Sequence, residues 1–171
     1  MLSSLKEKIG LRLLKNHKQA TKSEPLVSVN EAKMVGVVYN VKSTDQHYLQ
    51  KVRDYFSERG IEVYALGFVN EKTVEGYSSI YRDDYICKKH LNFWDIPKKE
   101  SIAKFIGTKF DYLINLDAAG IIPLQAVSIF SNAKTRFGKH FENFPFAHDF
   151  MIKGYAESPR ELFREIIKYI K

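Results

Sequence analysis

The residues best suited to binding a small molecule lie in two polar stretches, each directly after an apolar run. One stretch, 40–45, follows the apolar run 34–39, and the other, 117–121, follows the run 112–116. A lysine near the free N–H groups of a helix N-terminus is an arrangement that binds anions such as phosphate. The candidate ligand-binding residues are therefore Asn40, Lys42, Ser43, Thr44, Asp117 and Gly120.

Two of these candidates also fit purely structural roles. Ser43 and Gln46 have the spacing of a capping box at a helix start, and Asp117 has the position of a turn-forming residue. Neither Gly-x-Gly-x-x-Gly nor Gly-x-x-x-x-Gly-Lys-Ser/Thr occurs in the chain. The sequence therefore predicts no catalytic residue and no cofactor, and it favours a protein that is not an enzyme.

Metal binding and thiol chemistry find little support in the sequence. His140, His148 and Asp149 could converge on a metal, but their spacing matches no known pattern of ligands. Cys87 stands in an apolar context and is interpreted as a small core residue. No metal site is predicted.

The elements that must position the two polar stretches alternate between strand and helix. In chain order, the patterns predict strand 34–39, a helix from Ser43, strand 61–68, strand 84–88, a helix after Pro97, strand 112–116, a helix from Pro123, strand 133–138, strand 149–153 and a helix from Ser158. This alternation predicts an α/β domain with a Rossmann-like, doubly wound, mostly parallel sheet of five to six strands. Residues 69–97 give the weakest pattern, and their role stays open.

The predicted sheet brings the two polar stretches together. If the strand order is 3-2-1-4-5-6, strands 34–39 and 111–116 are neighbours at the point where the order reverses. Ligands of such sheets bind outside the carboxyl ends of the strands. We therefore expect a crevice formed by residues 40–45 and 117–121.

The charge of the chain is concentrated at its N-terminus. The formal net charge is +7, and residues 1–22 hold six basic residues against one acidic residue, a net +5. The rest of the chain is nearly neutral, so nucleic-acid binding is unlikely. The expected organisation is a basic amphipathic helical arm at 1–22, a linker at 23–33 and one Rossmann-like domain at 34–171.

The sequence favours a location in the cytoplasm. It has a single cysteine, no apolar run of membrane-spanning length and no signal-peptide pattern.

The arm has two interpretations. Leu2, Leu5, Ile9 and Leu13 fall on one stripe of a helix, whereas Leu11 and Leu14 lie off it. Docking on the body predicts that Leu5, Ile9 and Leu13 are buried. The alternative is a surface that binds an anionic membrane or a protein partner. The leucines off the stripe favour docking, because they would give a docked helix a second contact.

One stretch resembles a known enzyme family. FDYLINLDAAGIIPLQAVSIFSNAKTRFG, residues 110–138, is similar to the last strand–helix–strand of the N-terminal half of ADP-heptose-type bacterial glycosyltransferases. The matched residues are Ser131, Ala133, Lys134, Arg136 and Gly138. The family's Gly-Asp turn after the first strand is replaced here by residues 40–45, and the chain has no room for the family's second domain. The resemblance therefore implies the fold more than the activity.

A second resemblance covers most of the chain. The chain is similar to a small bacterial family of unknown function. The segments that carry this similarity are KKHLNFWDIPKKE, the stretch just described and the closing segment DFMIKG…ELFREIIKYIK. This resemblance supplies no activity. Two functions stay open: a non-enzymatic binding or adaptor domain, and a module that binds a nucleotide or nucleotide sugar, glycosyltransferase-like, in the crevice. The predicted partners are a small anionic ligand and, through the arm, a protein or an anionic membrane.

Overall fold

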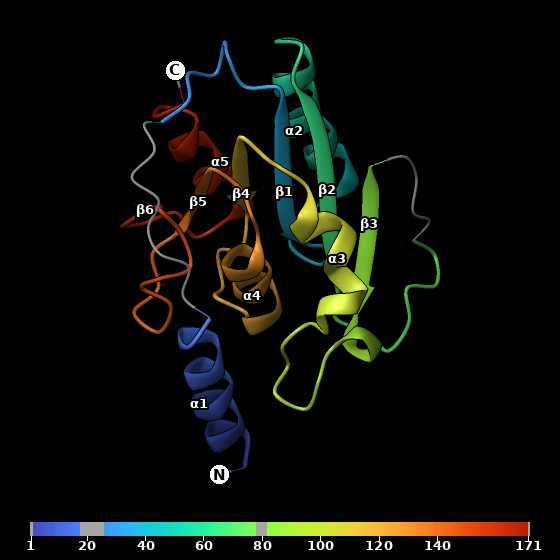
Figure 1. The fold of residues 1–171 in the computed structure, drawn as a ribbon. Coiled ribbons are helices and arrows are strands. Elements are labelled where there is room, and N and C mark those ends of the chain that lie inside the picture. The colour runs from blue at the N-terminus through green and yellow to red at the C-terminus, as the bar shows by residue number, and fades with distance from the viewer. Residues whose placement is uncertain (1, 18–25, 78–81, 171) are drawn as a thin grey trace.

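Six parallel strands form one sheet with helices on both faces (Figure 1), as the alternation of elements predicts. The computed structural model describes residues 2–17, 26–77 and 82–170, with side chains from Leu5 onward. The elements are α1 (Leu2–Lys15), β1 (Met34–Asn40), α2 (Gln46–Ser57), β2 (Glu62–Val69), β3 (Asp83–Cys87), the 3-10 helix η1 (Lys88–His90), α3 (Lys99–Gly107), β4 (Tyr112–Asn115), α4 (Ile122–Phe130), β5 (Thr135–Lys139), β6 (Phe150–Ile152) and α5 (Pro159–Ile166). The fold is α/β and Rossmann-like.

The strand order is β3-β2-β1-β4-β5-β6, so β1 and β4 are neighbours at the reversal point. β1 pairs with β2 from Met34–Glu62 to Asn40–Phe68, and with β4 from Val35–Tyr112 to Val38–Asn115. The near-continuous apolar character of these strands follows from their burial on both faces. All carboxyl ends therefore point to one edge of the sheet, the lower edge in Figure 1.

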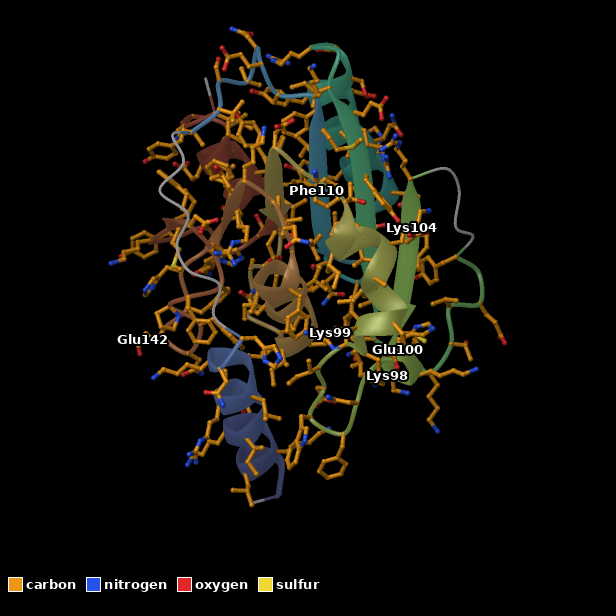
Figure 2. All side chains as sticks on the ribbon, viewed as in Figure 1. Lys98, Lys99, Glu100, Lys104, Phe110 and Glu142 are labelled. Atoms are coloured by element: carbon orange, nitrogen blue, oxygen red, sulfur yellow. The ribbon has the colours of Figure 1, made fainter. Side chains whose placement is uncertain are left out.

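Two cores sandwich the sheet. On one face Val37 of β1 packs with side chains of α2 and α5, including Phe56 and Phe163. On the other face Val38 packs with α3 and α4 and with Phe110, which is labelled above the upper end of α3 in Figure 2. Because successive side chains of a strand point to opposite faces, the adjacent residues 37 and 38 pack into different cores.

Helix α1 docks on the body, but through a different face from the one expected. Leu5 and Leu13 are 57% and 36% exposed, whereas Leu14 is fully buried against α4 and the loop 144–147. Gly10 lies on the same face as Leu14, and a Cβ at that position would approach the carbonyl oxygen of Trp94 to 3.0 Å. The expectation of burial is wrong for Leu5 and Leu13, and Ile9 is half-buried, because Gly10 permits close backbone approach on a neighbouring side of the helix.

The cap of α2 is a second correction. Ser43 does not cap this helix: the N-cap is Asp45, whose side chain accepts a hydrogen bond of 2.7 Å from the Tyr48 amide. The Ser43 hydroxyl instead donates to the carbonyl of Asn40, inside a turn that spans residues 40–44. Serine and aspartate are equally good caps, and the turn that holds Ser43 leaves Asp45 at the start of the helix.

The segment before β1 is packed against the domain. Val29 and Ala32, inside the range expected to be a linker, are buried in the core that contains α2 and α5. The hydroxyl of Tyr112 on β4 donates to the carbonyl of Val27. Among the helices that the structure describes, none is both long and apolar enough to cross a membrane.

Candidate functional site

A cavity of about 370 Å³ opens at the carboxyl edge of the sheet, next to the reversal point between β1 and β4. Its walls come from four strand ends or their following loops and from α1. The lining residues are Glu7, Asn40, Phe68, Asn70, Lys88, Leu91, Asp95, Gly120, Ile121, Ile122 and Pro123. We call this cavity the switch-point crevice. Its position is the one at which open parallel sheets bind ligands.

Strand ends supply one part of the polar crevice wall, and Glu7 of α1 and Asp95 supply another. Asn40 is the last residue of β1, Asn70 directly follows β2, and Lys88 directly follows β3. The side-chain oxygen of Asn40 accepts a hydrogen bond of 3.0 Å from the Lys42 amide, which leaves its NH₂ group as the donor. Lys88 is exposed and forms no ion pair with any residue in the described part of the chain. The strand ends thus offer amide groups and one lysine.

The loop after η1 supplies a second side of the crevice. The side-chain oxygen of Asn92 accepts from the amides of Trp94 and Ile96, at 2.8 and 3.1 Å. This organises a tight loop in which Asp95 has a φ of 61°, a left-handed conformation that aspartate tolerates better than most residues. The Asp95 carboxylate lies 2.8 Å from the ammonium of Lys6 on α1. The loop and α1 therefore close the crevice together.

The connection between β4 and α4 is shaped by Asp117. Its buried carboxylate accepts from the amides of Ala119 and Ile121, at 2.9 and 2.7 Å, and from the side chain of Gln125 at 2.8 Å. Burial raises the pKa of Asp117 above its ordinary value, against the effect of these hydrogen bonds. Asp117 does not line the crevice; it holds the turn that presents the start of α4 to it.

Gly120 is the part of this turn that does line the crevice. Its φ is 74°, and a Cβ there would lie 2.9 Å from the ring of Phe141. Both the conformation and the space thus require glycine. Gly120 and Asn40 are the two predicted site residues that meet in the cavity wall.

The other predicted residues lie beside the crevice. Lys42 and Ser43 are exposed in the turn after β1, and Thr44 is buried with a hydroxyl that has no hydrogen-bond partner among the described residues. None of the three is a lining residue. The sequence analysis missed Asn70, Lys88 and Asp95, which come from the poorly patterned segment 69–97. Attention to the ends of every predicted strand, and not only of the two central strands, would have brought in Asn70, two residues after strand 61–68, and Lys88, the last residue of strand 84–88.

The residues that carried the glycosyltransferase resemblance have structural roles here. Lys134 forms an ion pair of 2.7 Å with Asp111, and Arg136 forms one of 2.7 Å with Asp149. Gly138 faces His148 so closely that a Cβ would lie 2.4 Å from the imidazole. These contacts join β5 to its neighbours, and none of these residues lines the crevice.

The crevice lining carries three ionisable side chains, Glu7, Lys88 and Asp95, and contains no serine, threonine, cysteine or histidine. Carboxylates and lysine can act as general acids, general bases or nucleophiles as well as bind a ligand. Cys87 and His90 lie nearby, with 3.5 Å between Sγ and Nδ1, but the imidazole accepts from the Cys87 amide and the thiol is buried. Among the residues described, no three histidine, cysteine or acidic side chains gather into a possible metal site.

Comparison with known proteins gives one match. A family described as a family of unknown function, DUF6913, matches residues 4–171. No curated protein and no solved structure matches the chain. The match spans α1, the sheet and α5, so it includes every element that forms the crevice.

Proposed function

The chain belongs to the family of unknown function DUF6913, and we propose that it is a non-enzymatic binding domain for a nucleotide-sized anionic ligand. The observation that carries the proposal is the position of the switch-point crevice at the carboxyl ends of β1, β2 and β4. A volume of about 370 Å³ is within the range of small-molecule sites.

The lining matches the parts of a nucleotide. Lys88, which has no carboxylate partner among the described residues, is the group for a phosphate. The amides of Asn40 and Asn70 can donate to and accept from the polar edge of a base. Glu7 is a carboxylate, the group that binds ribose hydroxyls in related sheets.

Apolar side chains complete the site. Phe68, Leu91 and Ile121 line the same cavity and offer surface to the flat faces of a base. The lining has no serine, threonine, cysteine or histidine, and its Asp95 is paired with Lys6, which supports binding over group transfer. A nucleotide sugar remains within the same ligand class, because its nucleotide part presents the same groups.

The proposal is tested by thermal denaturation with nucleoside monophosphates, nucleoside diphosphates and nucleotide sugars. A ligand present at a hundredfold excess over its Kd raises the free energy of unfolding by about 2.7 kcal/mol. We expect Lys88→Ala to weaken binding by about tenfold or more, because it removes a charged hydrogen-bond partner of the phosphate.

The matched control is Lys42→Ala. Lys42 is also an exposed lysine after a strand of the same edge, but it does not line the crevice. The control variant is expected to bind as the wild type does. Equal losses in both variants, or no stabilisation of the wild type by any ligand of the panel, would contradict the proposal.

A further inference from the structure

Helix α1 keeps a second apolar stripe that the body does not cover. Leu5 and Leu13 are 57% and 36% exposed, and Ile9 between them is half-buried. At 100° per residue these three side chains share one side of the helix, whereas Gly10 and Leu14 define the docked side.

Cations flank the outward stripe. Lys8, Arg12 and Lys15 are exposed, and the helical period places them together on one flank of the stripe. None of the three has an ion-pair partner within the described ranges. On the other flank Lys6 is bound to Asp95. An apolar stripe beside unpaired cations is the pattern of helices that lie at a membrane surface.

The loop next to α1 adds an exposed aromatic side chain. Phe93 is 73% exposed, and the Lys6 ammonium lies 5.5 Å from its ring centre. Further along, Phe130 contacts both His17 after α1 and the ammonium of Lys99. Lys98 and Lys99 stand at the start of α3 in the lower half of Figure 2, which also contains α1. Apolar and cationic groups therefore lie at this end of the molecule, which also contains the acidic residues Glu100 and Glu142.

We propose that the outward face of α1, together with Phe93, binds an anionic phospholipid surface. Charge complementarity selects this occupant. A second copy of the chain would bring a second set of the same unpaired cations, in a protein whose net charge is already +7. A bilayer with anionic lipids neutralises these cations and takes up Leu5, Leu13 and Phe93. The docked face, with Leu14 and Gly10, stays on the body.

The test is sedimentation of the full chain with vesicles of phosphatidylcholine, with and without phosphatidylserine. We expect binding only to the vesicles that contain phosphatidylserine, and weaker binding as salt is added. Two variants are expected to reduce binding by about tenfold or more: Lys8→Glu/Arg12→Glu/Lys15→Glu and Leu5→Gln/Leu13→Gln. Because these side chains are exposed, both variants should keep the melting temperature of the wild type.

Matched controls separate the face of α1 from net charge and general hydrophobicity. Lys33→Glu/Lys51→Glu/Lys109→Glu makes the same change in net charge at exposed lysines away from α1, and Leu26→Gln changes a leucine that is 43% exposed. Both controls should bind as the wild type does. If the triple charge variant of α1 loses its fold, the single change Lys8→Glu is tested in its place.

Three results would overturn this inference. One is no sedimentation of the wild type with phosphatidylserine at low salt. Another is equal loss in the α1 variants and the controls. The third is a concentration-dependent dimer that Leu5→Gln/Leu13→Gln abolishes while vesicle binding is unchanged, which would assign the stripe to a second copy. None of these outcomes depends on the switch-point crevice, so this test and the nucleotide test fail independently.

Discussion

Arg136 and Asp149 show how a residue that resembles part of an enzyme motif can serve the fold instead. The guanidinium donates to both carboxylate oxygens, at 2.9 and 2.7 Å, and the Arg136 amide adds a third hydrogen bond of 2.9 Å. Arg136 is buried. Although burial opposes the shift, these contacts lower the pKa of Asp149 below its ordinary value of 3.8. The pair therefore fixes β5 against the start of β6.

Arg136→Ala is expected to lower the free energy of unfolding by about 3 kcal/mol, because it leaves a carboxylate without its buried partner. Lys134→Ala is the control: its ion pair with Asp111 is half-exposed at the lysine, and the expected loss is under about 1 kcal/mol. Urea denaturation of both variants gives the comparison. Similar losses of unfolding free energy in Arg136→Ala and Lys134→Ala would contradict the structural role assigned to Arg136.

The same pair predicts a dependence on pH. A carboxylate whose folded pKa is lowered contributes stability above 3.8, and this contribution is lost as the pH falls through the lower folded value. We expect the wild type to lose stability over that acid range and Arg136→Ala to lose less over the same range. The pKa of Asp111 is also lowered, so the stability of the variant should still fall with decreasing pH, but less steeply than that of the wild type. Denaturation curves at a series of acid pH values measure both slopes, and parallel slopes would exclude this pair as the cause.

Gly138 gives a second prediction for a residue of the resemblance. Gly138→Ala should destabilise the domain by about 2 kcal/mol or more, because the added methyl meets the buried ring of His148 at 2.4 Å. Adding His148→Ala should recover part of the loss, which a double-mutant cycle measures as coupling. Gly107→Ala is the control, since a Cβ there meets nothing within 4 Å. Strictly additive effects of the two changes would show that the contact is not the cause.

At the scale of elements, regular patterns were sufficient for most of the fold. The apolar runs of β1 and β4, the proline at the start of α4 and Ser158 at the start of α5 each predicted an element that the structure contains. The residues that cap a helix and the face through which a helix docks were harder to predict from the sequence. Ser43 and Asp45 both have the chemistry of a cap, and only the turn made by residues 40–44 decides between them.

The docked face of α1 shows the same limit. A stripe of leucines predicts an amphipathic helix, but it does not say that Gly10 on another face permits the closest approach. Adjacent leucines provide the test: Leu14→Ala should cost about 2–3 kcal/mol because Leu14 is fully buried, whereas Leu13→Ala should cost under about 0.5 kcal/mol. Thermal unfolding of both variants is the measurement. A larger loss at Leu13 would mean that the helix docks through its leucine stripe after all.

In the whole molecule, the strand order determines where the crevice forms. The order 3-2-1-4-5-6 is the one observed, and a cavity with Asn40 and Gly120 in its wall lies beside the reversal point. Asp95 could not be assigned to it from the sequence, because its segment has no clear periodicity and reaches the crevice only through the loop after η1. The involvement of α1 through Glu7 also depends on the docked orientation of that helix.

The most direct test of the proposed ligand site is to locate a bound nucleotide on the protein in solution. Amide chemical shifts of isotope-labelled full-length protein, titrated with the nucleotide that stabilises it most, provide this measurement. The account predicts saturating changes at Asn40, Asn70, Lys88 and the 120–122 turn. Changes confined instead to the larger groove between β6 and α5, lined by Tyr155 and Tyr169, would contradict the assignment of the ligand site to the switch-point crevice.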